Sequence, residues 1–166
     1  PDGNRYVDTN ATDGTEVVYR SPDASHWTRT TTPPGQTQPT TDVDIVSTSG
    51  GRLIASELDF TGINFVTSYS DDKGQTWTLV SNCNSRPMYF SQLRVDPSND
   101  KTIYVAGLPV AKSLDGGKTF ATLDEAGGNG EPGHVDQHAI WIDPKNPKHI
   151  MEGNDGGLNI SWDQGK

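Results

Sequence analysis

Residues 70–77 read Ser-Asp-Asp-Lys-Gly-Gln-Thr-Trp, and this stretch decides the fold because it recurs along the chain. A close copy, Ser-Leu-Asp-Gly-Gly-Lys-Thr-Phe, spans residues 113–120, and both copies fit the pattern Ser-x-Asp-x-Gly-x-Thr-aromatic. A third copy begins at Ser161, and the sequence stops before its aromatic residue. A weaker copy at residues 21–27 lacks the glycine and is one residue shorter.

The spacing of these copies indicates a repeated structural unit. They begin at positions 21, 70, 113 and 161, and so lie 49, 43 and 48 residues apart. A second marker, Asp-Pro-x-Asn, occurs at residues 96–99 and again 47 residues later at 143–146. Two independent markers with one period, of about 45 residues, are typical of the four-stranded blade of a β-propeller.

The segments between the markers predict four short strands per unit and almost no helix. We therefore expect an all-β fold of four-stranded antiparallel sheets, in which residues 1–166 form part of one propeller domain, about three blades plus fragments. Irregular connections are expected near residues 30–41 and 124–133. Within two units the predicted strands are residues 42–49, 52–58, 64–70 and 76–81, then 90–96, 101–107, 109–113 and 118–123.

Composition limits the classes of partner. The 166 residues carry 13 basic and 22 acidic side chains, a net charge of -9, which argues against nucleic acid as a partner. No apolar run is long enough to span a membrane, and no signal peptide is visible. The single cysteine, Cys83, cannot form an internal disulfide.

The motif itself is interpreted as a structural turn. An aspartate in a tight hairpin accepts bonds from nearby backbone N–H groups, and the glycine adopts positive φ. The hydroxyls bond locally, and the aromatic residue packs between sheets. This structural role is predicted for Ser70, Asp72, Gly74, Thr76, Trp77, Ser113, Asp115, Gly117, Thr119, Phe120, Ser161, Asp163 and Gly165.

The residues that do not repeat are the better candidates for function. In the stretch 133–141, His134, Asp136 and His138 alternate, and in a strand they would line one face at the propeller's central channel. Such a set could bind a divalent metal, contact a ligand without metal, or bond to loops of neighbouring blades. We list the three as ligand-binding candidates and as weak metal candidates.

Further candidates are weaker. Asp155, in the turn Gly-Asn-Asp-Gly-Gly at 153–157, and Asp136 are weak candidates for a catalytic acid. Arg86 and Tyr89 could reach the same channel mouth as His134. Glu57 and Asp59 share one strand face and are expected on a solvated edge.

The residues quoted above carry a family resemblance. The motif resembles the Asp-box, or BNR repeat, and residues 66–166 resemble bacterial sortilin-like BNR proteins, which are often labelled glycosyl hydrolases. The resemblance implies a segment of a large, many-bladed propeller that is secreted, periplasmic or on the cell surface. It implies less about chemistry, since the arginine triad of sialidases of this fold is not visible and no carboxylate pair can be named.

The sequence thus predicts a binding or assembly scaffold with a ligand site at the channel mouth. The alternative is a glycoside hydrolase, sialidase-like or xyloglucanase-like, with catalytic residues partly outside this segment. Expected partners are another protein or the remaining blades, and carbohydrate is a further candidate. No cofactor is expected.

Overall fold

The computed structural model describes residues 3–12, 15–34, 40–59, 65–81, 92–107, 110–123, 134 and 136–166, and these form strands and turns without any helix. The first sheet contains β1 (Arg5–Asn10), β2 (Glu16–Ser21) and β3 (Thr28–Arg29). The second contains β4 (Thr40–Ser47), β5 (Leu53–Asp59), β6 (Phe65–Ser70) and β7 (Thr78–Ser81). The third contains β8 (Leu93–Asp96), β9 (Asn99–Val105), β10 (Ala111–Ser113) and β11 (Ala121–Thr122). The fourth contains β12 (Gln137–Ile142), β13 (Ile150–Asn154) and β14 (Gly157–Ser161).

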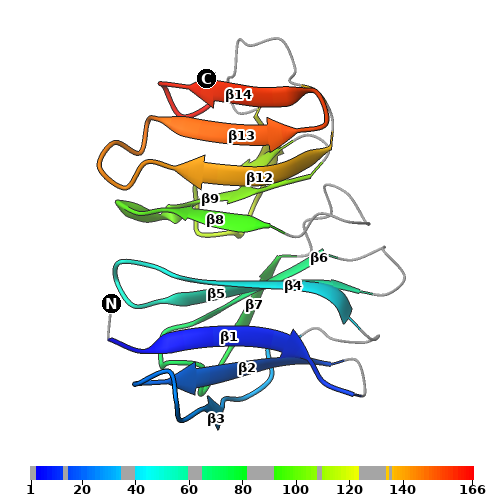
Figure 1. Cartoon of the computed structure of the whole chain (residues 1–166), viewed down its shortest axis with the longest axis vertical. Helices are drawn as coiled ribbons and strands as arrows, with labels where there is room; N and C mark the ends of the chain where they lie inside the picture. Colours follow the sequence, from blue (N-terminus) through cyan, green and yellow to red (C-terminus); the bar gives the residue numbers. More distant parts are fainter. Residues whose placement is uncertain are drawn as a thin grey trace.

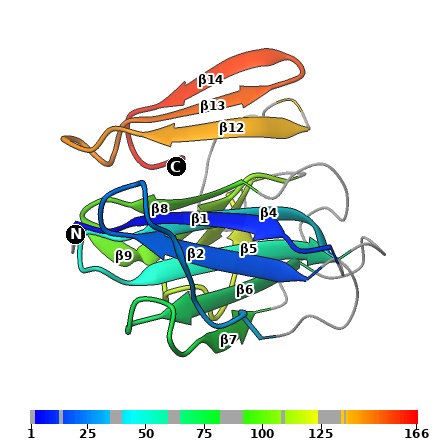
Figure 2. The ribbon, with the colours of Figure 1, turned by 60° about the horizontal axis from the view of Figure 1, so that its bottom comes forward.

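Each sheet is an antiparallel meander in which every strand pairs with the next one in sequence. The four sheets follow one another along the long axis of the molecule in chain order (Figure 1), and the strands of the second sheet fan out from β4 to β7 (Figure 2). The first strands β1, β4, β8 and β12 contact one another in succession. The predicted all-β fold with four-stranded antiparallel sheets is confirmed.

The motif fixes how the sheets correspond. It follows β2, β6, β10 and β14, so β1 aligns with the second strand β5. The first sheet therefore contains the equivalents of strands two to four, and the last sheet contains the equivalents of strands one to three.

Packing between the sheets explains why the middle strands do not alternate. In β5, residues 53–57 are all buried, and in β9 the run from Thr102 to Val105 is buried as well. A strand covered on both faces needs a nearly continuous apolar run, whereas a strand with one solvated face alternates. Residues 53–55, Leu-Ile-Ala, and 103–105, Ile-Tyr-Val, meet that need, whereas Thr102, Ser56 and Glu57 are polar residues buried in the same strands.

Two apolar clusters form the core. One lies between the second and third sheets and is built on Ile54, Leu93, Ile103, Val105 and Ala111. The other lies between the third and fourth sheets and is built on Tyr104, Ala106, Val110, Ile140, Ile142 and Ile150. Each large aliphatic side chain buried in this way contributes about 1.5–3 kcal/mol of transfer free energy.

The outward face of the fourth sheet is equivalent to the face of the third sheet that the fourth sheet covers. Register places Leu158 and Ile160 where Val110 and Lys112 stand in the third sheet. Val110 is buried by the fourth sheet, whereas Leu158 is 62% and Ile160 51% exposed. This face carries apolar side chains that nothing in the described residues covers.

Some predicted boundaries are wrong for local reasons. β11 covers only two residues instead of 118–123, because Lys118 and Thr119 belong to the motif turn and donate their N–H groups to the Asp115 side chain. The predicted connection at 30–41 is too long at its end, since Thr40 and Thr41 belong to β4. The predicted loop at 124–133 lies outside the described residues.

Candidate functional site

The motif turns are the turns at residues 21–27, 70–77, 113–120 and 161–166, and the second of them shows their construction. Ser70 is buried at the end of β6; its hydroxyl donates to Asp72 Oδ1 at 2.8 Å and accepts the Gly74 N–H at 2.8 Å. Asp72 Oδ1 accepts the Thr76 N–H at 2.8 Å, and Oδ2 accepts the Thr76 hydroxyl at 2.5 Å. These bonds, first that from the Thr76 hydroxyl, lower the pKa of Asp72 to about 2.

The same bonds recur in the later motif turns. In the third, the Ser113 hydroxyl donates to Asp115 at 2.8 Å, and Asp115 accepts the Thr119 N–H at 3.0 Å and hydroxyl at 2.7 Å. Burial raises the pKa of Asp115, but these hydrogen bonds outweigh it and bring the pKa to about 2. In the fourth, the serine–aspartate bond is 2.8 Å and the serine–glycine bond is 2.7 Å, formed by Ser161, Asp163 and Gly165.

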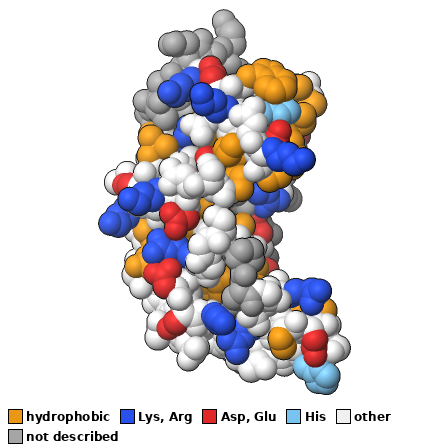
Figure 3. All heavy atoms as spheres, turned by 90° about the vertical axis from the view of Figure 1, so that its left-hand side faces the viewer, with side chains coloured by type: hydrophobic (Ala, Val, Ile, Leu, Met, Phe, Trp, Pro, Cys, Tyr) orange, Lys and Arg blue, Asp and Glu red, His pale blue; other side chains and the backbone are white. Residues whose placement is uncertain are grey.

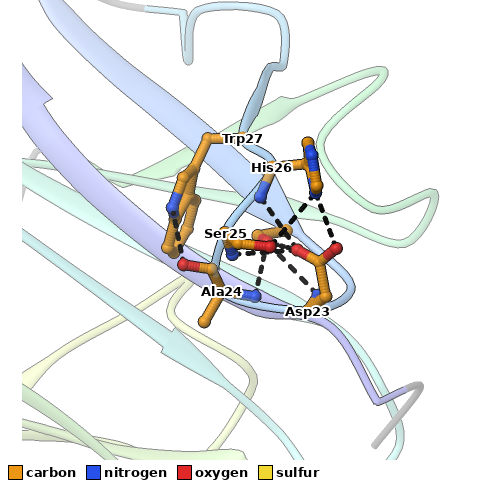
Figure 4. A network of polar contacts seen from close by, with 6 residues as sticks. Asp23, Ala24, Ser25, His26 and Trp27 are labelled. Carbon is orange, nitrogen blue, oxygen red and sulfur yellow. Dashed lines mark hydrogen bonds and ion pairs between the residues drawn. The ribbon is translucent and has the colours of Figure 1, made fainter.

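The first motif turn is a shortened version (Figure 4). Asp23 Oδ1 accepts the His26 N–H at 2.8 Å, and Oδ2 contacts the His26 ring at 2.8 Å, which lowers the pKa of Asp23. The Trp27 indole N–H donates to the Ala24 carbonyl at 3.2 Å. The longer turns place two consecutive residues at positive φ, whereas within 21–27 only Ala24 (φ 63°) does so.

The motif turns also contact the sheet that precedes them. A Cβ atom on Gly74 would lie 2.9 Å from the Thr30 Cβ, and the Trp77 indole N–H donates to the Thr31 carbonyl at 3.0 Å. The corresponding glycines of the third and fourth turns approach the preceding sheet as well. A Cβ atom on Gly117 would lie 3.6 Å from the Val80 side chain, and one on Gly165 would lie 3.1 Å from the Leu123 side chain. Phe120 packs against the core cluster between the second and third sheets. The motif residues therefore join neighbouring sheets.

The structure contradicts the predicted alternation of His134, Asp136 and His138. β12 begins only at Gln137, and Asp136 has a φ of 70°, which is not strand geometry. The register shifts between Gln137 and Ala139, so His138 is the extra residue of a bulge. Bulges re-aim side chains, and the three residues do not line one face of a strand.

Another arrangement brings the candidates together. The loop between β13 and β14 lies beside the start of β12, because Asn154 pairs with Gln137. His138 Nε2 contacts Asp155 Oδ1 at 2.5 Å, with the two side chains 53% and 52% exposed. A Cβ atom on Gly156 would lie 2.7 Å from the His134 Cβ, so the glycine admits that imidazole. Two candidates from separate stretches of sequence thus form one group.

Neighbouring amides support this group. The Gln137 side chain donates to the His134 carbonyl at 2.7 Å. Glu152 accepts the side-chain amides of Asn154 at 3.2 Å and Asn159 at 2.8 Å. We refer to His134, His138 and Asp155 as the hairpin site. Within the described ranges, no group of three or more His, Cys, Asp or Glu side chains is placed to hold a metal ion. Arg86 and Tyr89 lie outside the described residues.

Sequence reasoning missed a buried carboxyl pair between the first and second sheets. Glu16 in β2 is 0% exposed and Glu57 in β5 is 3% exposed, so the expectation of a solvated edge for Glu57 is wrong. Burial, followed by the charges of Glu57 and Asp8, raises the pKa of Glu16 well above its usual 4.5. Burial also raises the pKa of Asp8 to about 6. Because Glu16 is buried beside the charge of Glu57, its protonated form is favoured.

An arginine on an inner strand was missed as well. Arg94 in β8 contacts Asp44 of β4 at 3.2 Å and donates to the Ile140 carbonyl of β12 at 3.1 Å. It therefore links the second, third and fourth sheets. Its place within an apolar strand pattern was the available signal, because an arginine at such a position must find partners.

Comparison with known proteins supports the fold and no family. No model of a known protein family matches the chain, and no curated protein sequence matches it. Solved structures do match. A GH74 xyloglucanase from Xanthomonas campestris aligns over 98% of this chain and 28% of its own, with 15% identity and a TM-score of 0.62.

Two structures of YCF48 are similar to the same extent. YCF48 from Cyanidioschyzon merolae aligns over 98% of this chain and 48% of its own, with 13% identity and a TM-score of 0.63. YCF48 bound to D1 peptide aligns over 97% and 47%, with 19% identity and a TM-score of 0.61. The chain thus spans between about a quarter and a half of the length of these proteins.

These neighbours are β-propeller proteins, and the chain has the fold of a propeller segment. Its four sheets are successive blades, and β4, β8 and β12 are their inner strands. The hairpin site lies where the inner strand of the last blade begins.

Proposed function

We propose that this chain is part of a binding scaffold of the Asp-box, sortilin-like type, exported from its cell, which holds a ligand at the hairpin site. The family assignment is supported by the repeated serine–aspartate–glycine bonding of the motif turns. Export rests on the resemblance alone, and detection of the protein only in the cytoplasmic fraction of its host would contradict it. No helix in the described residues is long and apolar enough to cross a membrane.

The observation that carries the proposal is the contact between His138 and Asp155. Both side chains are half-exposed, and they come from a bulge and a hairpin loop that nothing in the repeat requires to meet. Polar groups on loops held by a rigid scaffold are a common form of binding site. Here the scaffold is the paired end of β12, β13 and β14.

The charge of the chain indicates what such a site holds. A net charge of -9 attracts cations and repels polyanions, and Asp155 adds a local carboxylate. One of the similar structures is YCF48 bound to D1 peptide, so a propeller of related shape holds a peptide. We therefore favour a basic peptide segment of a protein partner as the ligand.

The second candidate is a glycoside hydrolase, which the similarity to a xyloglucanase favours. Hydrolysis of a glycosidic bond needs two carboxyl groups on either side of the substrate. Glu16 and Glu57 form a pair, but both are buried, so a sugar chain does not reach them. Asp155 is accessible, yet its contact is with His138 and not with a second carboxylate.

The proposal is tested by binding and by hydrolysis in parallel. A short synthetic peptide of alternating lysine and glycine is titrated calorimetrically into the chain, and xyloglucan is incubated with it. We expect peptide binding, weakened about tenfold in His138→Ala and in Asp155→Asn, and no release of reducing ends. The matched control is His26→Ala, which removes a second exposed histidine–aspartate pair and leaves binding unchanged.

Two results would contradict the scaffold. Equal losses in His138→Ala and His26→Ala would show that only general charge matters. Release of reducing ends by the native chain, abolished in Asp155→Asn, would establish the hydrolase instead.

A further inference from the structure

Three aromatic rings meet at the opposite end of β13 and β14 from the hairpin site. The Trp162 indole is stacked on the His149 imidazole, with ring centroids 3.8 Å apart and planes 6° from parallel. Trp141 meets the same imidazole edge-on, at 5.5 Å and 84°. Figure 3 shows hydrophobic side chains gathered beside a histidine at the end of the molecule that carries the last sheet.

The stack holds an exposed indole in a defined orientation. His149 is 8% exposed, and its Nδ1 lies 3.6 Å from Asp143 Oδ2. Burial and this contact hold the imidazole in place. Trp162 is 66% exposed. One of its faces covers the imidazole, and the exposed area therefore includes the other face.

Equivalent positions in the other sheets show that a side chain at this position is exposed even when another sheet follows. Trp162 follows the motif serine, and the same position is held by Asp71 and Leu114 in earlier sheets. Leu114 is 63% exposed although the fourth sheet follows it, and the Asp71 side chain is 58% exposed with the third sheet in place. Trp162 thus stands at a hairpin that a following sheet does not cover.

The partner position differs from sheet to sheet as well. Arg52 is the equivalent of His149, and it binds Asp71 with two bonds of 2.7 and 2.9 Å. In the second sheet these two positions are therefore joined by a salt bridge. In the last sheet they are joined by a ring stack. A salt bridge would serve the fold equally, whereas the stack also offers a flat apolar surface to solvent.

We propose that the Trp162 indole, held flat on His149, binds the apolar face of a neutral sugar ring. The face of an indole carries negative potential, and the C–H groups on one face of a pyranose present positive hydrogens to it. Lys148 adjoins His149 and Asp163 adjoins Trp162 in sequence, and their side chains carry a donor and acceptors for hydroxyl groups.

The surrounding charge selects among ligands. The charge of Lys166 acts on Asp163, and Lys148 adjoins His149 in sequence, so a cation gains little at this surface. An anionic sugar is repelled by a chain of net charge -9. A ring already held in place loses little conformational entropy on binding, which favours association with a neutral ligand. The site is separate from the hairpin site and does not depend on its function.

The test uses cellopentaose and maltopentaose as neutral probes and pentagalacturonate as an anionic one. The Trp162 indole N–H resonance is followed by NMR during titration of the chain. We expect a saturable shift with at least one neutral sugar, and an affinity at least about tenfold lower in Trp162→Leu. This variant places at 162 the residue type found at the equivalent position 114, so the hairpin keeps a side chain that it accommodates. Leu114→Ala is the matched control and leaves affinity unchanged.

Three results would overturn the proposal. The first is no shift of the indole resonance with either neutral sugar up to about 10 mM. The second is unchanged affinity in Trp162→Leu, which would place binding elsewhere. The third is binding of pentagalacturonate as tight as that of the neutral sugars, which would show that the site does not select neutral sugars.

Discussion

At the scale of single residues, Ser70 shows how a short side chain stabilises a motif turn. Its hydroxyl is the acceptor for the buried N–H of Gly74. We expect Ser70→Ala to lower the free energy of unfolding by about 1–3 kcal/mol, because the N–H loses its partner and stays buried. Chemical denaturation measures this change. Ser25→Ala, at an exposed hydroxyl of the first motif turn, is the control, and similar losses in the two variants would contradict the account.

The buried carboxyl pair makes a prediction about pH. Glu16 holds its proton more tightly in the folded chain than in the unfolded one, so from pH 4.5 upward the unfolded chain binds fewer protons. The contribution of Glu16 to stability is therefore full below pH 4.5 and falls as the pH rises through neutrality. The expected slope is about 1 kcal/mol per pH unit. Denaturation curves at pH 5, 6, 7 and 8 measure it.

Glu16→Gln tests the origin of that slope. The amide fills the same space without titrating, so the variant should be the more stable protein at pH 8 and show a shallower slope. Glu152→Gln removes a glutamate from the middle strand of the last sheet and serves as the control. A slope that survives in Glu16→Gln would assign the pH dependence to other groups.

Single residues also show where sequence reasoning succeeds. The bonding within the motif turns involves residues two to four apart, so the residue types at fixed spacing determine the geometry. His134 and Asp136 could not be placed in this way, since the positive φ of Asp136 and the bulge at His138 depend on the neighbouring hairpin. The burial of Glu57 depends on a sheet that is distant in sequence, and its own segment carries no sign of it.

At the scale of elements, the docking of a motif turn on the preceding sheet can be separated from the strain of its backbone. Gly74 (φ 83°) faces Thr30 at 2.9 Å, whereas Gly116 (φ 80°) has nothing within 4 Å of a Cβ. Gly116→Ala carries only the left-handed backbone cost of about 1–2 kcal/mol. Gly74→Ala adds a clash with the first sheet, and we expect a loss about 1–3 kcal/mol larger.

The two variants are compared by denaturation under one set of conditions. Equal losses would mean that the first sheet yields to the added methyl group, and the turn would then not be a fixed contact between sheets. If the Gly74→Ala loss falls to the Gly116→Ala level in the Thr30→Gly background, that contact is confirmed directly.

The elements themselves were largely predictable. Strands of the second and third sheets follow from apolar segments at a fixed distance from the motif, and β4 to β10 lie where those segments lie. The ends of strands were not predictable, because β11 is shortened by bonds to the Asp115 side chain and β12 begins only after Asp136, whose φ is positive. The meeting of His138 with Asp155 required the register of β12 with β13, which residue spacing alone does not contain.

At the scale of the whole molecule, Arg94 ties three sheets together near their inner strands. Burial raises the pKa of Asp44, and the Leu93 N–H and Arg94 oppose that rise. Removal of the guanidinium would leave Asp44 as a half-buried carboxylate without its cation. We expect Arg94→Leu to lower the free energy of unfolding by about 2–3 kcal/mol, less than for a fully buried pair because both side chains are partly exposed.

A double-mutant cycle with Asp44→Asn isolates the pair from the contact with Ile140. Arg52→Leu is the control, since that arginine binds Asp71 within one sheet at the surface, and its loss should cost about 0.2–1 kcal/mol. Purely additive effects of Arg94→Leu and Asp44→Asn would show that this ion pair contributes nothing to holding the two sheets together.

The meander topology has a consequence for folding. Every strand of the described sheets pairs with its neighbour in sequence, and the main contacts between sheets join consecutive ones. The loops between strands that are neighbours in sequence close at small entropic cost. Any sheet can therefore nucleate, and its neighbours can add to it. Amide exchange should then be slowest in β5 and β9, which have sheets on both sides, and fastest in β14. A uniform exchange rate across the four sheets would instead show that the segment opens only as a single cooperative unit.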